Sequence, residues 1–321
     1  LKIAHTTSFA FDASWEQLLW LLAGHEVHVI DDELRRDPDR LLPLFDREEV
    51  DAFDVTPTYG SYLVEHGLLE RDRPQGRPGT GVVFVSLGGE AVGQDLWTRL
   101  REAKGVSGYN LYGPTEYTIN ALGADLAENA EPTVGRPIAN TDAYILGPGL
   151  QPAPVGVTGE LYLGGVGLAR GYVGRPATTA ERFVANPFGR PGERIYRTGD
   201  LARWRVDGGI DYLGRSDNQL KIRGYRIEPA EIENALVAQE GVKRAAVVGR
   251  AAQEGSVRLV AYVVGDGLST DADSLRELLR LHLPSYMVPA AIMFVDDLPR
   301  TINGKLDVAS LPDPSMTDTQ I

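Results

Sequence analysis

The sequence has 321 residues, a formal net charge of -13 and no cysteine. This length is enough for two domains with a sizeable core. The acidic balance disfavours a nucleic-acid partner held by bulk electrostatics, and the lack of cysteine excludes disulfides and thiolate metal sites. No apolar run is long enough to span a membrane and no signal peptide is visible, so we expect a cytoplasmic protein without a membrane partner.

The first 130 residues alternate between helix-like and strand-like patterns. Expected helices cover residues 15–23, 38–49, 59–66 and 94–103, and expected strands cover residues 26–30, 51–55 and 81–87. Asp37 before Pro38 is a helix N-cap signal, and Asp12 and Ser14 are cap candidates for the first helix. A Pro- and Gly-rich loop is expected at 71–80. Repeated βα units predict a largely parallel sheet with helices on its faces.

The rest of the chain changes character twice. Residues 131–216 are glycine-rich and strand-like, with strands expected at 142–146, 159–163, 201–205 and 209–213. Gly208 and Gly209 predict a hairpin turn between the last two. Residues 217–312 form a small α+β domain, with helices expected at 231–239 and 273–283 and strands at 242–248, 257–264 and 291–295. Residues 313–321 are polar and read as a linker. The fold class is therefore α/β, with a βα-repeat sheet layer, a β-rich subdomain and a small C-terminal domain.

The most informative motif is Tyr196–Leu201, which contains Thr-Gly-Asp and is followed by cation-rich segments at 214–217 and 221–228. An ionised aspartate only accepts hydrogen bonds, so Asp200 suits the two hydroxyls of a ribose. Fixed cations nearby suit a polyanion. Taken alone, Thr-Gly-Asp is equally a tight surface turn.

Other motifs accompany it in order. They are Phe11–Ser14, Asn110–Glu116, Gly159–Leu163 with Ala169–Tyr172, Leu283–Pro289 and Asn303–Asp307. From Phe9 to Pro314, this series resembles the adenylation domains of nonribosomal peptide synthetases, within the adenylate-forming ligase superfamily. The resemblance implies that an amino acid and ATP form aminoacyl-AMP and pyrophosphate, with Mg²⁺. The aminoacyl group then passes to the phosphopantetheine thiol of a carrier domain.

The resemblance also implies roles for individual residues. Tyr112 stacks on adenine, Thr115 contacts phosphate and Glu116 holds Mg²⁺. Lys305 bridges the attacking carboxylate and the α-phosphate, and Asp217 is the hinge of the small domain. The remaining nucleotide-binding residues are Gly89, Glu90, Asn110, Asp200, Tyr212 and Arg215.

For the amino acid, the resemblance assigns Asp12 to the α-ammonium group, which needs a paired carboxylate in an apolar pocket. The expected lining is Ala13, Asp54, Val85, Leu87, Leu111, Ile119 and Asn120, with Trp15 as an optional member, because the segment at 14–16 is one residue shorter than usual. A buried Asp54 favours a polar or basic substrate side chain of modest length. The alternative is that Asp54 caps the helix after Pro57.

Partners and departures complete the picture. Leu311–Pro314 resembles the linker to a downstream carrier domain, and Ala180–Phe188 resembles a docking segment for MbtH-like proteins. The family's phosphate-binding loop is absent, so we expect a missing N-terminal part and no adenylate formation by this chain alone. Two alternatives stay open: an acyl-CoA ligase of the same superfamily, against which Asp12 argues, and a non-catalytic docking fragment.

Overall fold

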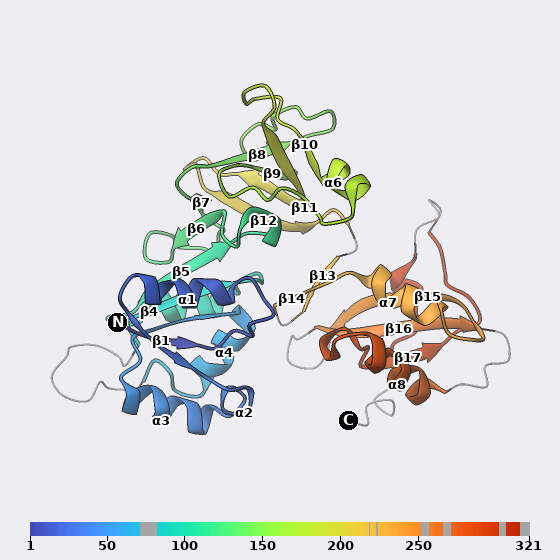
Figure 1. Cartoon of the computed structure of the whole chain (residues 1–321), viewed down its shortest axis with the longest axis horizontal. Coiled ribbons are helices and arrows are strands. Elements are labelled where there is room, and N and C mark those ends of the chain that lie inside the picture. Colours follow the sequence, from blue (N-terminus) through green and yellow to red (C-terminus); the bar gives the residue numbers. More distant parts are fainter. Residues whose placement is uncertain are drawn as a thin grey trace. The chain divides into compact units, whose positions relative to one another are not determined.

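The structure is a computed structural model that describes residues 1–70, 82–217, 219–222, 224–251, 257–265, 271–301 and 306–314. The chain forms two compact units, Leu1–Asp217 and Asn218–Ile321 (Figure 1). The expected loop at 71–80 and the predicted catalytic Lys305 lie outside the described residues. No helix of the described residues is long and apolar enough to cross a membrane.

The first unit contains a seven-stranded sheet in the order β2-β1-β3-β4-β5-β6-β7. Its strands are β1 (Lys2–His5), β2 (Glu26–Val29), β3 (Ala52–Val55), β4 (Phe84–Gly88), β5 (Ser107–Tyr112), β6 (Leu122–Asp125) and β7 (Arg136–Pro137). The pairs among β1 to β5 are parallel, whereas β6 and β7 are antiparallel additions. The strand order reverses between β1 and β3, which makes their carboxyl ends a topological switch point, where ligands bind in open α/β sheets.

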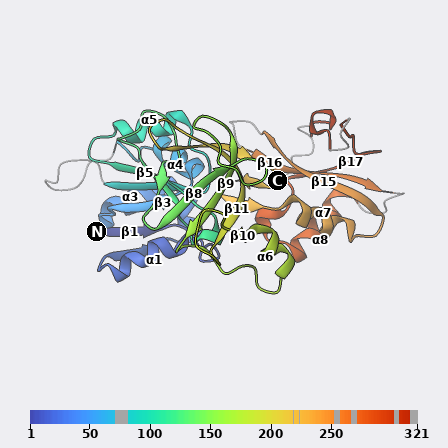
Figure 2. The same ribbon diagram turned by 90° about the horizontal axis from the view of Figure 1, so that it is seen from above.

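Helices cover both faces of this sheet, with α1 on the face opposite α4 and α5 (Figure 2). They are α1 (Ser14–Leu22), α2 (Asp32–Arg35), α3 (Pro38–Glu48), α4 (Pro57–Glu65) and α5 (Gln94–Glu102). The main core lies on the α3–α5 side, where Phe45, Leu63 and Trp97 pack together. Asp37 caps α3 by accepting a hydrogen bond from the Arg40 N–H at 3.2 Å, as its place before Pro38 predicts.

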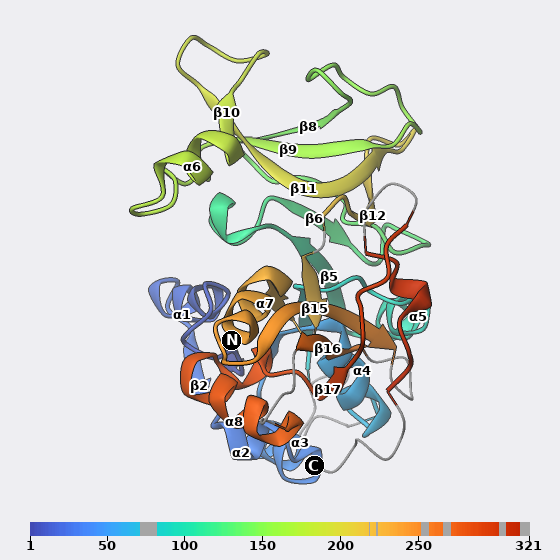
Figure 3. The ribbon, with the colours of Figure 1, turned by 90° about the vertical axis from the view of Figure 1, so that its right-hand side faces the viewer.

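A second sheet in the same unit has the order β10-β11-β9-β8, with β12 paired to β11 (Figure 3). Its strands are β8 (Thr141–Leu146), β9 (Gly159–Gly165), β10 (Phe183–Ala185), β11 (Arg194–Trp204) and β12 (Ile210–Arg215), and helix α6 (Pro176–Arg182) precedes β10. The predicted β11–β12 hairpin is confirmed, and Gly208 supplies the positive φ of 83° at its turn.

The segment Thr133–Gly135 ties the two sheets together. The Asn110 amide on β5 donates to the Thr133 carbonyl at 2.7 Å, and the Thr133 hydroxyl donates to the Ile210 carbonyl on β12 at 2.7 Å. Gly135 has φ 76°, and a Cβ there would stand 1.9 Å from the Gly123 carbonyl oxygen on β6. Only glycine fits this crossing.

The second unit pairs a hairpin with a three-stranded sheet. The hairpin is β13 (Leu220–Ile222) and β14 (Tyr225–Ile227); the sheet is β15 (Val242–Ala251), β16 (Val257–Gly265) and β17 (Ala291–Phe294), and the helices are α7 (Pro229–Val237) and α8 (Ala272–His282). Alternate residues of β16 face two cores: Leu259 and Ala261 pack with both helices, whereas Val260 and Tyr262 pack with Leu311. The α/β fold class and its small α+β unit are confirmed.

The expected cap of the first helix is wrong. Ser14 is the first helical residue, and its hydroxyl donates to the Phe11 carbonyl at 2.7 Å. Asp12 accepts from the adjacent Ala13 N–H at 2.8 Å and does not cap either. The cause is that Ala13 already has helical angles (φ -56°, ψ -20°), whereas a capping residue needs an extended backbone.

We predict that Asp37→Ala lowers the free energy of unfolding by about 1 kcal/mol, because α3 loses its cap. The measurement is urea unfolding followed by far-UV circular dichroism. Asp37→Asn is the matched control, since its amide oxygen still accepts from Arg40 and stability should stay near wild type. Equal loss in both variants would show that the cap contributes nothing.

Candidate active site

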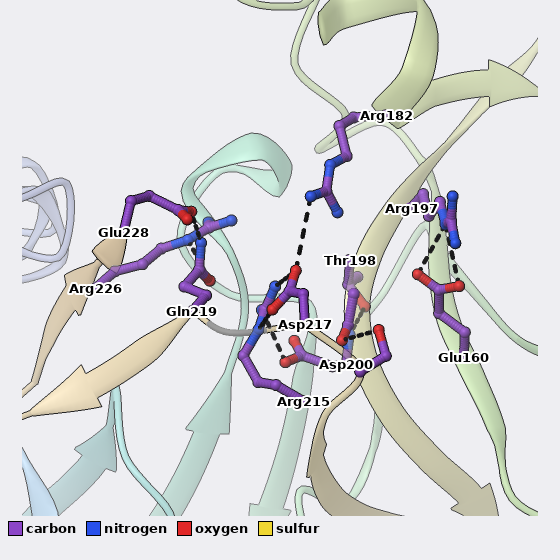
Figure 4. A network of polar contacts seen from close by, with 12 residues as sticks. Glu160, Arg182, Arg197, Thr198, Asp200, Arg215, Asp217, Gln219, Arg226 and Glu228 are labelled. Carbon is purple, nitrogen blue, oxygen red and sulfur yellow. Dashed lines mark hydrogen bonds and ion pairs between the residues drawn. The ribbon is translucent and has the colours of Figure 1, made fainter. Parts of the chain in front are cut away.

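Asp200 lies on β11 with only 2% of its surface exposed. The Tyr112 hydroxyl at the end of β5 donates to its Oδ2. Arg215 on β12 holds its Oδ1 with Nη1 at 3.0 Å (Figure 4). A buried carboxylate needs such partners because desolvation otherwise makes it costly. Three sequence motifs that are far apart in the chain therefore meet at one carboxylate.

Arg215 also clamps Asp217. Its Nε and Nη2 each lie 2.7 Å from one carboxylate oxygen of Asp217, and Arg182 adds an ion pair at 3.6 Å (Figure 4). Gly199 leaves room for this arrangement, since a Cβ there would stand 2.6 Å from Arg215 Nη2 and its φ is 78°. The Thr-Gly-Asp turn therefore needs its glycine for packing as well as for backbone conformation.

Two tyrosines flank Asp200. The ring centroids of Tyr112 and Tyr212 are 6.1 Å apart. Burial and the charge of Asp200 raise the pKa of Tyr212 to about 12 and hold the pKa of Tyr112 well above its usual range. Both phenols are therefore protonated at neutral pH, and Tyr112 donates to Asp200. Aromatic faces beside an acceptor pair suit a nucleoside.

Glu116 sits in the short helix η1 (Thr115–Tyr117) and is 9% exposed, whereas Thr115 is exposed. The Tyr172 hydroxyl donates to Glu116 Oε1 at 2.5 Å, and the Ala169 N–H donates to the Glu116 carbonyl at 2.9 Å. Burial and this hydrogen bond raise the pKa of Tyr172, which keeps it a donor. The motif at 169–172 thus supports the motif at 110–116, a role that the sequence alone did not suggest.

The donor set around Glu116 is compatible with Mg²⁺ held mainly by phosphate. In the described ranges, no group of three or more His, Asp or Glu is placed to hold a metal ion. Magnesium commonly takes one or two carboxylates plus phosphate oxygens and water. Glu116 would therefore be the protein ligand, and a bound nucleotide would supply the rest.

Three other predicted nucleotide-binding residues lie directly after β4 or within β5. Gly89 adopts φ 83° after β4, and Glu90 Oε2 accepts from the Thr58 hydroxyl at 2.6 Å and N–H at 3.1 Å. Asn110 is 5% exposed and commits its amide to the Thr133 carbonyl. Its side chain therefore contributes to the fold, joining the two sheets.

The predicted amino-acid residues divide between the two faces of the sheet. Asp54 on β3 is in register with Ser86 on β4, whose hydroxyl donates to Asp54 Oδ1. Val85 and Leu87 are each 1% exposed and belong to the core with α3, α4 and α5. Since successive residues of a strand point to opposite faces, Ser86 takes the place beside Asp54 that we predicted for Val85 and Leu87. The residue beside Asp54 on β4 is therefore Ser86, and the prediction of Val85 and Leu87 is out of register by one residue.

The alternative role of Asp54 as a helix cap is also wrong. Thr56 caps α4, accepting from the Tyr59 N–H at 3.4 Å. Asp54 Oδ2 is instead buried and has no hydrogen-bond partner in the described part of the chain. Burial raises the pKa of Asp54 above its usual range.

Glu16 lies close to Asp54 and Asn120, and the sequence analysis did not predict it as a site residue. It follows Asp12 by four residues, so helical spacing could have placed both on one face. Its Oε1 accepts a hydrogen bond from the Asn120 amide. Burial, followed by the charge of Asp54, raises the pKa of Glu16 to about 8. Trp15, the optional lining residue, is 61% exposed.

The turn that carries Asn120 is tightly constrained. A Cβ at Gly113 would stand 2.1 Å from the Ile119 carbonyl oxygen. Thr118 and Ile119 have φ of 56° and 73°, a costly conformation for β-branched residues. The turn brings the predicted pocket residue Asn120 to α1, where its amide donates to Glu16, and Ile119 directly precedes it. Leu111 lies on β5 and pairs with Gly123 on β6, shortly after this turn, and Ala13 directly precedes α1.

Comparison with known proteins places the chain in a family. Residues 1–173 match the model of the AMP-binding enzyme family and residues 231–305 match that of the AMP-binding enzyme C-terminal domain. The chain therefore belongs to the AMP-binding enzyme family, and the resemblance to adenylation domains of nonribosomal peptide synthetases is confirmed.

Individual relatives agree. The chain is 42% identical over 320 residues to vanchrobactin synthetase VabF of Vibrio anguillarum, covering 97% of this chain and 11% of VabF. Among solved structures, AB3403, a four-domain nonribosomal peptide synthetase bound to AMP and glycine, is 36% identical with a TM-score of 0.61, covering 98% of this chain and 23% of that one. Holo-PA1221, which contains adenylation and PCP domains, is 29% identical with a TM-score of 0.80, covering 97% and 52%. The chain thus spans a small part of the curated relative and about half or less of these structures.

We predict that Arg215→Ala lowers the free energy of unfolding of the first unit by about 3–5 kcal/mol, because it leaves Asp200 buried without its cation. Thermal and urea unfolding of the chain measure this loss. Arg203→Ala is the matched control. Its pair with Asp211 joins side chains that are 47% and 19% exposed, so the change should stay below about 1 kcal/mol. Similar losses in both variants would contradict the special role of Arg215.

Proposed function

We propose that the chain carries the main part of an amino-acid-activating site that uses ATP. The observation that supports this most strongly is the buried Asp200 with Tyr112 and Arg215 around it. A carboxylate offers about four acceptor positions, so Asp200 can receive ribose hydroxyls in addition to these two donors. Asp12 lies at the start of α1, where the α-ammonium group of an amino acid would find a carboxylate.

In the proposed reaction, a carboxylate oxygen of the amino acid attacks the α-phosphorus of ATP. A phosphorus–oxygen bond forms, the bond to the β-phosphate bridge breaks, and pyrophosphate leaves with its electron pair. Mg²⁺, when bound, neutralises phosphate charge. Lys305 would lower the repulsion between the two reacting anions, as its motif implies. A carrier thiol would then displace AMP from the carbonyl carbon and form a thioester.

The second half-reaction needs a carrier domain and a movement of the smaller unit. The relatives that are nonribosomal peptide synthetases, and the solved adenylation and PCP protein, support a carrier with a phosphopantetheine arm as the partner. Asp217 is the proposed hinge residue. A change of backbone angles at one position can redirect a whole domain.

An additional protein partner is proposed at the segment Ala180–Phe188. A concave surface of about 640 Å³ opens beside it, lined by Tyr172, Ala180, Phe183 and three arginines, Arg170, Arg175 and Arg194. Arg194 lies over the Phe183 ring at 5.5 Å. Such a mixture of aromatic and arginine side chains is typical of protein interfaces. It supports the resemblance of this segment to MbtH-docking segments.

The test of the nucleotide site compares AMP with 2′,3′-dideoxy-AMP by calorimetry on the chain. We expect wild type to lose roughly 10- to 100-fold in affinity with the dideoxy compound, since hydrogen bonds to a charged acceptor contribute about 1.5–3 kcal/mol. Asp200→Asn should bind AMP more weakly and distinguish the two compounds less. Asp207→Asn, at the β11–β12 turn, is the control.

The catalytic claim is tested by pyrophosphate exchange on the native polypeptide that contains this sequence. Exchange should depend on a particular amino acid. Equal affinity for both nucleotides, or exchange that ignores amino acids, would count against the proposal.

For the partner surface, we predict that Ala180→Arg abolishes co-purification with an MbtH-like protein, because a long charged side chain fills the concave surface. Ala177→Arg places the same residue on α6 outside that lining and should retain the partner. The measurement is affinity co-purification after coexpression. If neither variant or wild type retains any of several MbtH-like proteins, the partner is wrong.

A further inference from the structure

We infer that Glu16 and Asp54 bind a positively charged group at the end of the substrate side chain, so the activated amino acid is basic. This inference rests on the proposed amino-acid activation and names the substrate class. The charged group is an ammonium or guanidinium, because these are the side-chain cations of common amino acids that stay fully charged at neutral pH. Glu16 thereby becomes a residue that determines specificity.

The location argues for a ligand site independently of any acidic character. Asp54 is the penultimate residue of β3, and α1, which carries Glu16, follows β1. The strand order reverses between β1 and β3. Asp54 therefore lies near the carboxyl end of a strand at the topological switch point, where open α/β sheets bind small molecules. Helix α1 brings Glu16 close enough for the charge of Asp54 to raise its pKa. Their shared face is the one that α1 covers.

Asp54 carries the buried atom that lacks a partner. Its Oδ1 accepts from the Ser86 hydroxyl, while Oδ2 is enclosed and makes no hydrogen bond with any described residue. A buried acceptor without a donor costs free energy, and a carboxylate costs more than a neutral group. Gln17 is close enough to lower the pKa of Asp54, but its amide donates to the Thr7 hydroxyl at 3.0 Å and to the Asp54 carbonyl at 3.3 Å rather than to Oδ2. A ligand donor would supply what Oδ2 lacks.

The site gathers three acidic side chains, and the charges of Asp54 and Asp12 both raise the pKa of Glu16. Among the described residues, no Lys or Arg forms an ion pair with Asp12, Glu16 or Asp54. His5 at the end of β1 is 1% exposed, and burial lowers its pKa, so it is neutral at pH 7. One cation on the substrate α-carbon can pair with Asp12. A second cation, on the substrate side chain, would allow Glu16 to give up its proton and would pair with both Glu16 and Asp54.

Two hydrogen-bond donors hold the carboxylates of Glu16 and Asp54 in place. Asn120 donates to one oxygen of Glu16, and Ser86 donates to one oxygen of Asp54. Asn120 follows Ile119, which is kept at φ 73°. A turn held in a costly conformation is consistent with positioning the amide for Glu16. Asn120 and Ser86 are thus positioning residues for the two carboxylates.

The alternative is that the site binds a neutral polar side chain. Proton release on binding distinguishes a cationic side chain from a neutral one. Without a cation, Glu16 retains its proton at pH 7, because burial and the charge of Asp54 raise its pKa to about 8. A bound cation favours the ionised form, so its binding releases a proton at pH 7. The affinity for a cationic ligand should therefore rise as pH increases from 6 to 8, whereas that for a neutral ligand should not rise.

The experiment uses non-hydrolysable aminoacyl sulfamoyl-adenosines as probes, measured by calorimetry on the chain. Lysyl, ornithyl and arginyl probes are compared with norleucyl, norvalyl and glutaminyl probes of similar size. We expect the best cationic probe to bind roughly 10- to 100-fold more tightly than its neutral counterpart. Titrations in two buffers of different ionisation enthalpy should show proton release for the cationic probe alone.

Variants test whether Glu16 and Asp54 bind the cationic group. Glu16→Gln and Asp54→Asn should each reduce the preference for the cationic probe and, for Glu16→Gln, remove the proton release. Glu33→Gln on α2 is the control, since Glu33 is exposed and pairs with Arg40. Circular dichroism verifies that each variant is folded, and Asn120→Ala adds a milder change if Asp54→Asn is unstable.

The outcomes separate this inference from the function on which it rests. Equal or tighter binding of neutral probes overturns the basic side chain while leaving amino-acid activation in place. Failure of all aminoacyl probes and of AMP to bind overturns both. Cationic preference that survives Glu16→Gln and Asp54→Asn unchanged overturns the assignment of these carboxylates.

Discussion

A buried carboxylate is the constraint around which the first unit is organised. Asp200 is stable inside the protein only because Tyr112 and Arg215 compensate for its lost hydration. Tyr112 ends β5 of the parallel sheet, while Asp200 and Arg215 belong to β11 and β12 of the other sheet. The pairing thus fixes how the ends of two sheets approach one another. The same arrangement requires glycine at position 199, because a side chain there would collide with the Arg215 guanidinium.

The same logic explains why several short motifs occur together in one chain. Glu116 is oriented by Tyr172, which comes from a segment some fifty residues later, and Asn110 is tied to Thr133. Each motif is weak by itself because its role is to satisfy a polar atom of another motif. A network that is fully satisfied gives a defined arrangement, whereas a partial one is costly. In this region, polar pairing and fold specification are the same requirement.

Local signals allowed most of the elements to be predicted. Asp37 with Pro38, and Gly208 at a hairpin, act through their own backbone and are visible in sequence. Long-range register was less accessible. The resemblance assigns Val85 and Leu87 to the pocket, one residue away from Ser86. A shift of one residue exchanges the two faces of a strand, and the sequence does not show which neighbour is aligned with Asp54. Glu16 was missed because its importance arises from a carboxylate on another element. Ser14 failed because the helix begins one residue earlier than its cap pattern suggests.

The Thr133–Gly135 crossing has a consequence for protein engineering. Exchanging the β-rich half for that of a relative would require a junction near residue 130, on the parallel-sheet side of this crossing. The incoming half would bring Thr133 and Gly135, but their partners Asn110 and Gly123 would come from the host. A bulkier residue at position 135 would push the halves apart, because its Cβ would collide with the Gly123 carbonyl oxygen of the host. A chimera is therefore compatible only if the backbone has enough space at residue 135. Complementary side chains elsewhere cannot compensate for a clash there.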